Sequence, residues 1–225
     1  MRSSALQVTR PASVRQARDQ AYRELILRTA EQIFAADGFH EAKMARVAAA
    51  ASVSMKTVYE LFSSKEALYQ AVHEWRAAEF GAVVRNGFPA EGPVLKLARR
   101  AIERVVAFFC ERPAYLRLQL SEGVGWALGR FGRPEHQSIW RDGFEGATQM
   151  VERGMDAGLL VAGDAERTVR VMAAIYQTLL ADWLDGDGKR TPGELAEEMN
   201  AYFVRAFCVP GTADATGAKA TRRRR

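Results

Sequence analysis

The sequence predicts an all-α protein with two helical domains. Apolar residues recur at intervals of three and four along nearly the whole chain. No stretch shows the sustained alternation of apolar, β-branched residues that is typical of strands. Short helical segments near the N-terminus give way to longer ones after "GFPAEGP" at 87–93, which predicts a small domain followed by a larger one.

The N-terminal segment is expected to form a basic arm and a compact group of short helices. Residues 1–22 are polar and arginine-rich without periodicity, so we expect a flexible basic arm. The first helix lies in "RELILRTAEQIFAADGF", and Gly38 provides its stop. Helices in "KMARVAAAA" and "MKTVYELF" follow, and a longer one begins at Lys65. Their short links require tight packing, and we assign 23–68 to the first domain.

The second domain is assigned to 69–209. Its longer helices are predicted in "VLKLARRAIERVVAFFCER", "AYLRLQLSEGVGWALG", 135–158, "DAERTVRVMAAIYQTLLADWL" and "TPGELAEEMNAYFVRAFCV". Thr191, Pro192 and Glu194 have the pattern of a capping box with proline in the first turn. Residues 210–225 contain mainly Ala, Thr, Gly and Arg, so we expect a disordered basic tail.

Composition and charge restrict the function. The formal net charge is +5, and its basic excess lies from Met1 to Lys65 and in the last nine residues, whereas the section between is acidic. A basic front indicates a polyanionic partner, although such an excess also describes an ordinary solvated face. Cys110 and Cys208 are far apart beside apolar residues, which favours core positions over a disulfide or a metal site. We expect no cofactor.

Membrane and enzyme functions are not indicated. No run approaches the roughly 18 apolar residues of a membrane span, and no secretory signal is visible, so we expect a soluble, cytoplasmic protein. His40, His73 and His136 are scattered, and no phosphate loop, nucleophile elbow or metal-ligand spacing occurs. The sequence therefore does not predict an enzyme.

The stretch "SVSMKTVYELFSSKEALY" at 52–69 predicts a DNA-recognition helix. With Ser54 as N-cap, the first turns of the helix project a set of candidate DNA-binding residues: Met55, Lys56, Thr57 and Tyr59. A helix fits the major groove, and its N-terminus attracts phosphate. In "SSKE", Ser63 and Glu66 form a capping box, and the cation of Lys65 in the first turn opposes the helix dipole. That placement favours a phosphate opposite Lys65, with a solvated lysine as the alternative.

These elements resemble the DNA-binding domain of the tetracycline-repressor (TetR) family. The resemblance covers roughly residues 23–72 and rests on Ala30, Phe34, "DGF" at 37–39, Val47, Ala48, Ala51 and "VS…TVYELFSSKEAL". It implies a helix-turn-helix with Tyr59 and Lys65 on phosphates and the start of the third helix on bases. The sequence departs from the family pattern at two places. Ala42 and Lys43 replace the hydroxyl residues that open helix two, so a cap worth about 1 kcal/mol is missing and Lys43 is a candidate phosphate contact. Ser52 replaces the turn glycine and must adopt a left-handed conformation or reshape the turn.

The resemblance further implies an effector-binding second domain. Its middle helices carry many large apolar side chains, which are either core residues or cavity walls. The candidate ligand-binding residues are Phe108, Tyr115, Leu120, Trp126, Trp140, Phe144 and Tyr176. No charged cluster dominates this region, so the expected effector is apolar or aromatic.

The last two helices predict a homodimer. Each has a wide apolar stripe near the end of the chain, with Met172, Leu179 and Trp183 on one and Leu195, Met199 and Phe203 on the other. Pairing with symmetry mates would bury both stripes in a four-helix bundle, as the family resemblance also implies. The alternative is that both stripes pack within their own chain.

The leading hypothesis is a homodimeric transcriptional regulator, a repressor that binds a palindromic operator in double-stranded DNA and leaves it when a small effector binds. The alternative is a helical adaptor without an effector, which uses the same surface for protein contacts.

Overall fold

The computed structural model describes residues 14–87, 91–121, 134–186 and 188–212, and over these residues the regular secondary structure is entirely α-helical. The only strand-like feature of this part is an isolated antiparallel bridge between Leu160 and Cys208. The chain divides into two compact units, residues 1–72 and 73–225.

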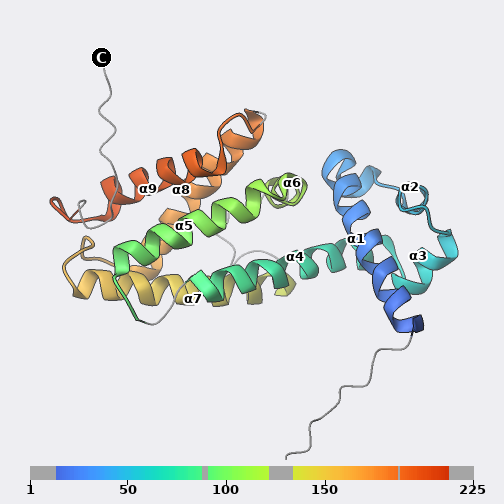
Figure 1. Cartoon of the computed structure of the whole chain (residues 1–225), viewed down its shortest axis with the longest axis horizontal. Coiled ribbons are helices and arrows are strands. Elements are labelled where there is room, and N and C mark those ends of the chain that lie inside the picture. The colour runs from blue at the N-terminus through green and yellow to red at the C-terminus, as the bar shows by residue number, and fades with distance from the viewer. Residues whose placement is uncertain (1–13, 88–90, 122–133, 187, 213–225) are drawn as a thin grey trace, which may run out of the picture. The chain divides into compact units, whose positions relative to one another are not determined.

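The first unit contains α1 (Val14–Glu41), α2 (Met44–Ala50), α3 (Met55–Leu61) and the start of α4 (Lys65–Gly87), as Figure 1 shows. Its core is formed by one apolar face from each helix. The most buried members are Ile26, Ala30, Phe34, Val47, Val58, Leu68 and Val72. An aromatic group supports this core, because the ring of Tyr69 meets Phe34 edge-on at 5.0 Å and Phe39 at 4.9 Å. The start of α4 is thus part of the first unit.

Two features of α1 bear on the predicted arm and stop. The helix begins at Val14, so the prediction of a flexible arm is wrong for residues 14–22, and residues 1–13 lie outside the described part. The packed segment of α1 already nucleates the helix. Polar residues with good helix propensity can therefore extend it at little cost in free energy. Gly38 has φ 76° and ψ 163°, which breaks the helix where we predicted its stop.

Side-chain caps begin four of the described helices: α3, α4, α8, where Asp164 accepts from the N–H of Arg167 at 2.8 Å, and α9. Ser54 caps α3 and Thr191 forms the predicted capping box with Glu194 on α9. For α4 the cap lies one residue later than predicted: the Oγ atom of Ser64, not of Ser63, accepts from the backbone N–H of Ala67 at 3.1 Å. Consecutive serines made this assignment ambiguous in the sequence.

The second unit contains the rest of α4 with α5 (Val94–Cys110), α6 (Pro113–Ser121), α7 (Pro134–Asp156), α8 (Ala165–Asp185) and α9 (Pro192–Phe207). α5 packs against α6, α7 and α9, and α8 packs against α6, α7 and α9 (Figure 1). The apolar faces of these helices form one continuous core. α4 joins it through Phe80, whose ring lies 5.2 Å from that of Phe108 and 5.4 Å from that of Phe109.

The chain after α9 turns back toward the core. The N–H of Thr212 donates to the carbonyl of Val209 at 3.2 Å, so residues 210–212 form a turn, contrary to the predicted disorder there. Residues 213–225 lie outside the described part. Among the described helices, none is long and apolar enough to cross a membrane.

Candidate nucleic-acid interface and ligand-binding site

α3 presents most of its side chains to solvent. Val58 is the residue of this helix that is fully buried, and it anchors α3 to the first unit. Met55 is 37% exposed and Tyr59 is 50% exposed, which is unusual for large apolar side chains, and the Lys56 side chain is 84% exposed. Exposed large side chains on one short helix are typical of a recognition surface.

Hydroxyl groups fix the start of α3. The Oγ atom of Ser54 accepts from the backbone N–H of Thr57 at 3.0 Å, and the two hydroxyl oxygens lie 2.9 Å apart. This is the N-cap predicted from the sequence. It leaves Thr57 half-buried, beside Lys56 at the N-terminal end of the helix.

The turn between α2 and α3 contains Ser52 with φ 54°, so Ser52 adopts the left-handed conformation, the first of the two alternatives that the sequence left open. The N–H groups of Ser52 and Val53 donate to the carbonyls of Ala49 and Ala48 at 3.1 and 3.0 Å. These are the two hydrogen bonds of a Schellman motif. The helix-turn-helix angle is therefore set by backbone hydrogen bonds, at the cost of strain at a residue that is not glycine.

The two lysines predicted to contact phosphates lie in different surroundings. Lys43 is the exposed N-cap residue of α2 and makes no side-chain cap, as its identity predicted. Lys65, in contrast, is half-buried. Its ammonium donates to the carbonyls of His40 and Ala42 at 2.9 and 3.2 Å and lies 4.7 Å from the ring centroid of Phe39. These contacts use two of its three N–H donors to hold the end of α1.

The candidate ligand-binding residues that the structure describes lie in or against the core of the second unit. Tyr115 is buried in the core of the second unit, and Leu120 and Phe144 are packed against it. Trp126 lies outside the described residues, as does the side chain of Trp140. Tyr176 also packs against this core. Its hydroxyl is buried without a hydrogen-bond partner in the described part, and burial, followed by the nearby Cys208, raises its pKa.

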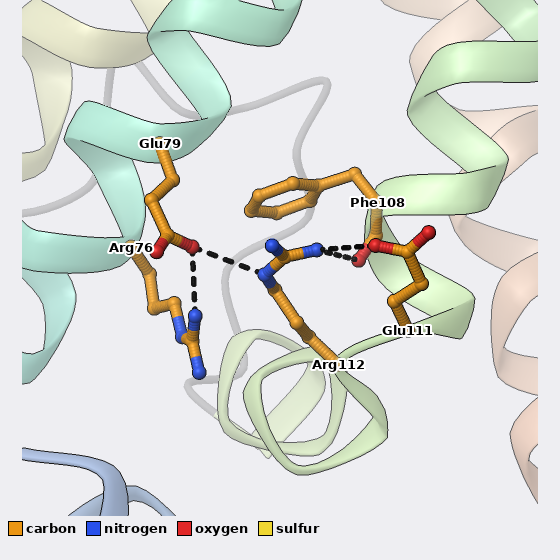
Figure 2. Close-up of polar contacts among 5 residues, drawn as sticks. All are labelled: Arg76, Glu79, Phe108, Glu111 and Arg112. Carbon is orange, nitrogen blue, oxygen red and sulfur yellow. Dashed lines mark hydrogen bonds and ion pairs between the residues drawn. The ribbon is translucent and has the colours of Figure 1, made fainter. Parts of the chain in front are cut away.

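A groove between α4 and α5 contains one candidate, Phe108, together with residues that the sequence did not single out. Its volume is about 710 Å³, and its other lining residues are Glu79, Ala82, Val83, Arg104, Ala107, Glu111 and Arg112. Figure 2 shows Arg112 between Glu79 of α4 and the C-terminal turn of α5. The lining residues recur at helical intervals, but nothing in that spacing distinguishes a groove from a packed face.

The predicted dimer residues are buried within a single chain. All six lie at 8% exposure or below: Met172, Leu179, Trp183, Leu195, Met199 and Phe203. They belong to the core that α8 and α9 share with α5 and α7. The arrangement is the alternative stated above, in which both stripes pack within their own chain. The outer faces of these helices expose smaller side chains and two larger apolar ones, Val171 at 46% and Tyr202 at 39%.

No group of three or more His, Cys, Asp or Glu side chains in the described residues is arranged to hold a metal ion. Burial raises the pKa of the Cys110 thiol to about 11, and Glu111 beside it contributes further. Cys208 is buried with a raised pKa for the same principal reason. Neither thiol is an activated nucleophile.

The first unit thus has the geometry of a helix-turn-helix DNA-binding domain, in which α2 supports an exposed α3. Residues 26–72 match the family described as "Bacterial regulatory proteins, tetR family". Over 53 residues the chain is 43% identical to the HTH-type transcriptional regulator UidR of Escherichia coli K12. These residues make up 24% of this chain and 27% of UidR. The first unit therefore contains a DNA-binding domain of the TetR type.

Solved structures extend the likeness to the whole fold. SmeT, the repressor of the Stenotrophomonas maltophilia multidrug efflux pump SmeDEF, is 19% identical with a TM-score of 0.64. The alignment covers 86% of this chain and 94% of SmeT. The regulator FadR from Bacillus subtilis in complex with stearoyl-CoA is 15% identical with a TM-score of 0.65, over 80% of this chain and 97% of FadR. At these identities the likeness establishes the all-helical fold and not the ligand.

Proposed function

We propose that this protein is a homodimeric repressor that binds a palindromic operator and is released by a small, largely apolar or aromatic effector. The observation that carries the proposal is the exposed surface of α3. It displays Met55, Lys56 and Tyr59 while Val58 anchors the helix. Side chains at the start of a recognition helix can reach base edges in the major groove.

Individual residues have different roles in this proposal. Lys56 and Thr57 contact base edges, whereas Lys43 and Tyr59 contact phosphates and position the protein without reading sequence. Ser54 holds the N-terminus of α3, where backbone N–H groups face a phosphate. Lys65 instead holds the end of α1 through the carbonyls of His40 and Ala42.

A two-fold operator requires a two-fold protein. The outer face of α8 and α9 suits a symmetric contact, because it combines Val171 and Tyr202 with small exposed residues. These small residues are Ala174 and Thr178 on α8 and Ala206 on α9. Pairing that face with its symmetry mate would form a four-helix bundle. Two recognition helices then reach successive major grooves, about 34 Å apart.

Effector binding acts by population shift: a ligand that favours a different spacing of the two α3 helices weakens operator binding. Two of the structural neighbours illustrate the range of this fold, since one is a repressor of a multidrug efflux pump and the other is in complex with stearoyl-CoA. We expect an effector of this chain to bind the second unit, as the family resemblance of the first unit implies.

The test is selection of binding sequences from random duplex DNA with the full-length protein. We expect an inverted repeat, and substitution of Lys56 or Thr57 should change the selected bases. Substitution of Tyr59 with Phe should weaken binding to all sequences alike. Selection that returns no preferred sequence, or a protein that light scattering shows to be monomeric at micromolar concentration, would contradict the proposal.

A further inference from the structure

The groove between α4 and α5 is formed by one face of each helix. Glu79, Ala82 and Val83 line it from α4 at positions i, i+3 and i+4, and α5 contributes a matching face that includes Ala107 and Phe108. Phe80, next to this face on α4, packs its ring between the helices against Phe108 and Phe109. Large rings therefore separate the helices while alanines fill little of the groove. Its volume of about 710 Å³ lies within the range of small-molecule sites.

The lining is polar at its ends and apolar between them. Arg112 lies at one end with Glu79 and Glu111. Arg104 precedes Glu111 by two helical turns, which places it about 10 Å further along the axis of α5. The lining between them is apolar and consists of Ala82, Val83, Ala107 and Phe108.

Arg112 is held in place with part of its guanidinium still available. Its Nε atom donates to Glu79 at 3.0 Å, and Nη1 donates to the Phe108 carbonyl at 3.3 Å and to Glu111 at 3.0 Å (Figure 2). The guanidinium also lies 4.5 Å from the ring centroid of Phe108. No acceptor among the described residues meets Nη2. These contacts pre-organise Arg112 to donate a charge-assisted hydrogen bond to a ligand.

The charges around the groove select the sign of that ligand. Glu79 also accepts from Arg76 at 2.7 Å, and Arg76 is 7% exposed, so Glu79 is shared by two guanidinium groups. Because two guanidinium groups offset the charge of Glu79, that carboxylate repels an anion less, and the remaining Nη2 donor of Arg112 favours an anionic acceptor over a cation.

We propose that this groove binds a small monocarboxylate whose apolar body, about 10 Å long, lies between α4 and α5 while its carboxylate accepts from Nη2 of Arg112. The apolar body contacts Val83, Ala107 and Phe108. This inference rests on the proposed function, because it assigns the effector site and its chemistry.

The test is calorimetric titration of the full-length protein with three probes of equal chain length: octanoate, octan-1-ol and octylamine. Octanoate should bind at least about tenfold more tightly than octan-1-ol, and octylamine should give no binding. Ala82→Trp places a bulky ring in the groove from an exposed position, so it should abolish octanoate binding without loss of thermal stability. Arg112→Gln should reduce the affinity for octanoate to that for octan-1-ol. Arg117→Gln, at an exposed residue of α6 outside the groove, is the matched control and should bind as the wild type does.

Several outcomes would overturn the inference. Equal affinities for octanoate and octan-1-ol in the wild type would show that Arg112 does not recognise the carboxylate. Tighter binding of octylamine would assign recognition to Glu79 and Glu111. Unchanged octanoate binding by Ala82→Trp, or no binding of any probe at millimolar concentration, would remove the groove as the site.

Operator release separates this inference from the proposed function. Octanoate that binds in the groove without releasing the selected operator would support the site and contradict its role as an effector site. Octanoate that releases operator from Ala82→Trp as well as from the wild type would support effector control and contradict the groove.

Discussion

Lys65 provides the sharpest test of how the first unit works, because its intramolecular contacts and the phosphate contact predicted from sequence have different consequences. We expect Lys65→Met to lower stability. Loss of the two hydrogen bonds to His40 and Ala42 costs about 2 kcal/mol together, and loss of the cation–π contact with Phe39 costs about 0.5 kcal/mol. Removing a cation from the first turn of α4 stabilises the helix by about 0.5 kcal/mol, because the cation opposes the helix dipole. The net cost is therefore about 2 kcal/mol.

In a chain of 225 residues that cost corresponds to a fall in Tm of about 4–8 °C, which differential scanning fluorimetry measures readily. We further expect the slope of log affinity against log salt to stay unchanged below the melting range. A phosphate contact at Lys65 would instead make that slope shallower by about 0.9. The matched control is Lys56→Met. Its side chain is 84% exposed with Glu60 3.8 Å away, so this variant should keep its Tm and change operator recognition.

An unchanged Tm with a shallower salt slope for Lys65→Met would refute the reasoning. It would mean that the ammonium leaves the two carbonyls for the DNA backbone, and that other contacts, such as Phe39 with Tyr69 and Asp37 with Arg46, hold the end of α1.

Three further predictions concern strain, the dimer and the thiols. Ser52→Gly should raise the free energy of unfolding by about 1 kcal/mol in urea titrations, since glycine adopts the left-handed conformation without strain; a lower midpoint would mean that the Ser52 side chain stabilises the turn. Phe203→Asp should unfold the second unit, because Phe203 is 1% exposed within its own chain. Val171→Asp, at a residue that is 46% exposed, should give folded monomers by light scattering. Folded monomers from Phe203→Asp would instead place Phe203 in the dimer interface. At pH 8, Cys110 should react with iodoacetamide at least about 100-fold more slowly in the native protein than in guanidinium chloride. The native rate should rise as the pH approaches the Cys110 pKa of about 11. Equal rates in the two conditions would contradict burial of the thiol.

Local signals in the sequence predicted local structure well. Gly38, Ser54 and the Thr191 capping box act through residues at most a few positions away, and each has the predicted conformation or cap. The partners of Lys65 could not be predicted in this way. The carbonyls of His40 and Ala42 lie 25 and 23 positions earlier in the chain, and only the packed arrangement of α1 and α4 brings them to the ammonium.

The second unit shows a different limit. The periodicity of Met172 and Phe203 identified faces that must be buried, but periodicity does not say whether the same chain or a partner covers them. The groove was missed for a related reason. Ala82 and Ala107 leave space because they are small, and an alanine on a helix carries no sequence signal that separates an open wall from an ordinary surface.

The aromatic group around Tyr69 limits where the first unit could be cut or transplanted. Leu68 and Val72 complete the core beneath α1, and the Tyr69 ring contacts the rings of Phe34 and Phe39. Leu68, Tyr69 and Val72 all follow the helix-turn-helix in the chain. A fragment that ends at Ser64 would contain every residue of α1, α2 and α3 and still lack one wall of its core. Such a fragment should remain unfolded, and a nascent chain should acquire its recognition surface only after the ribosome has released residues beyond Val72.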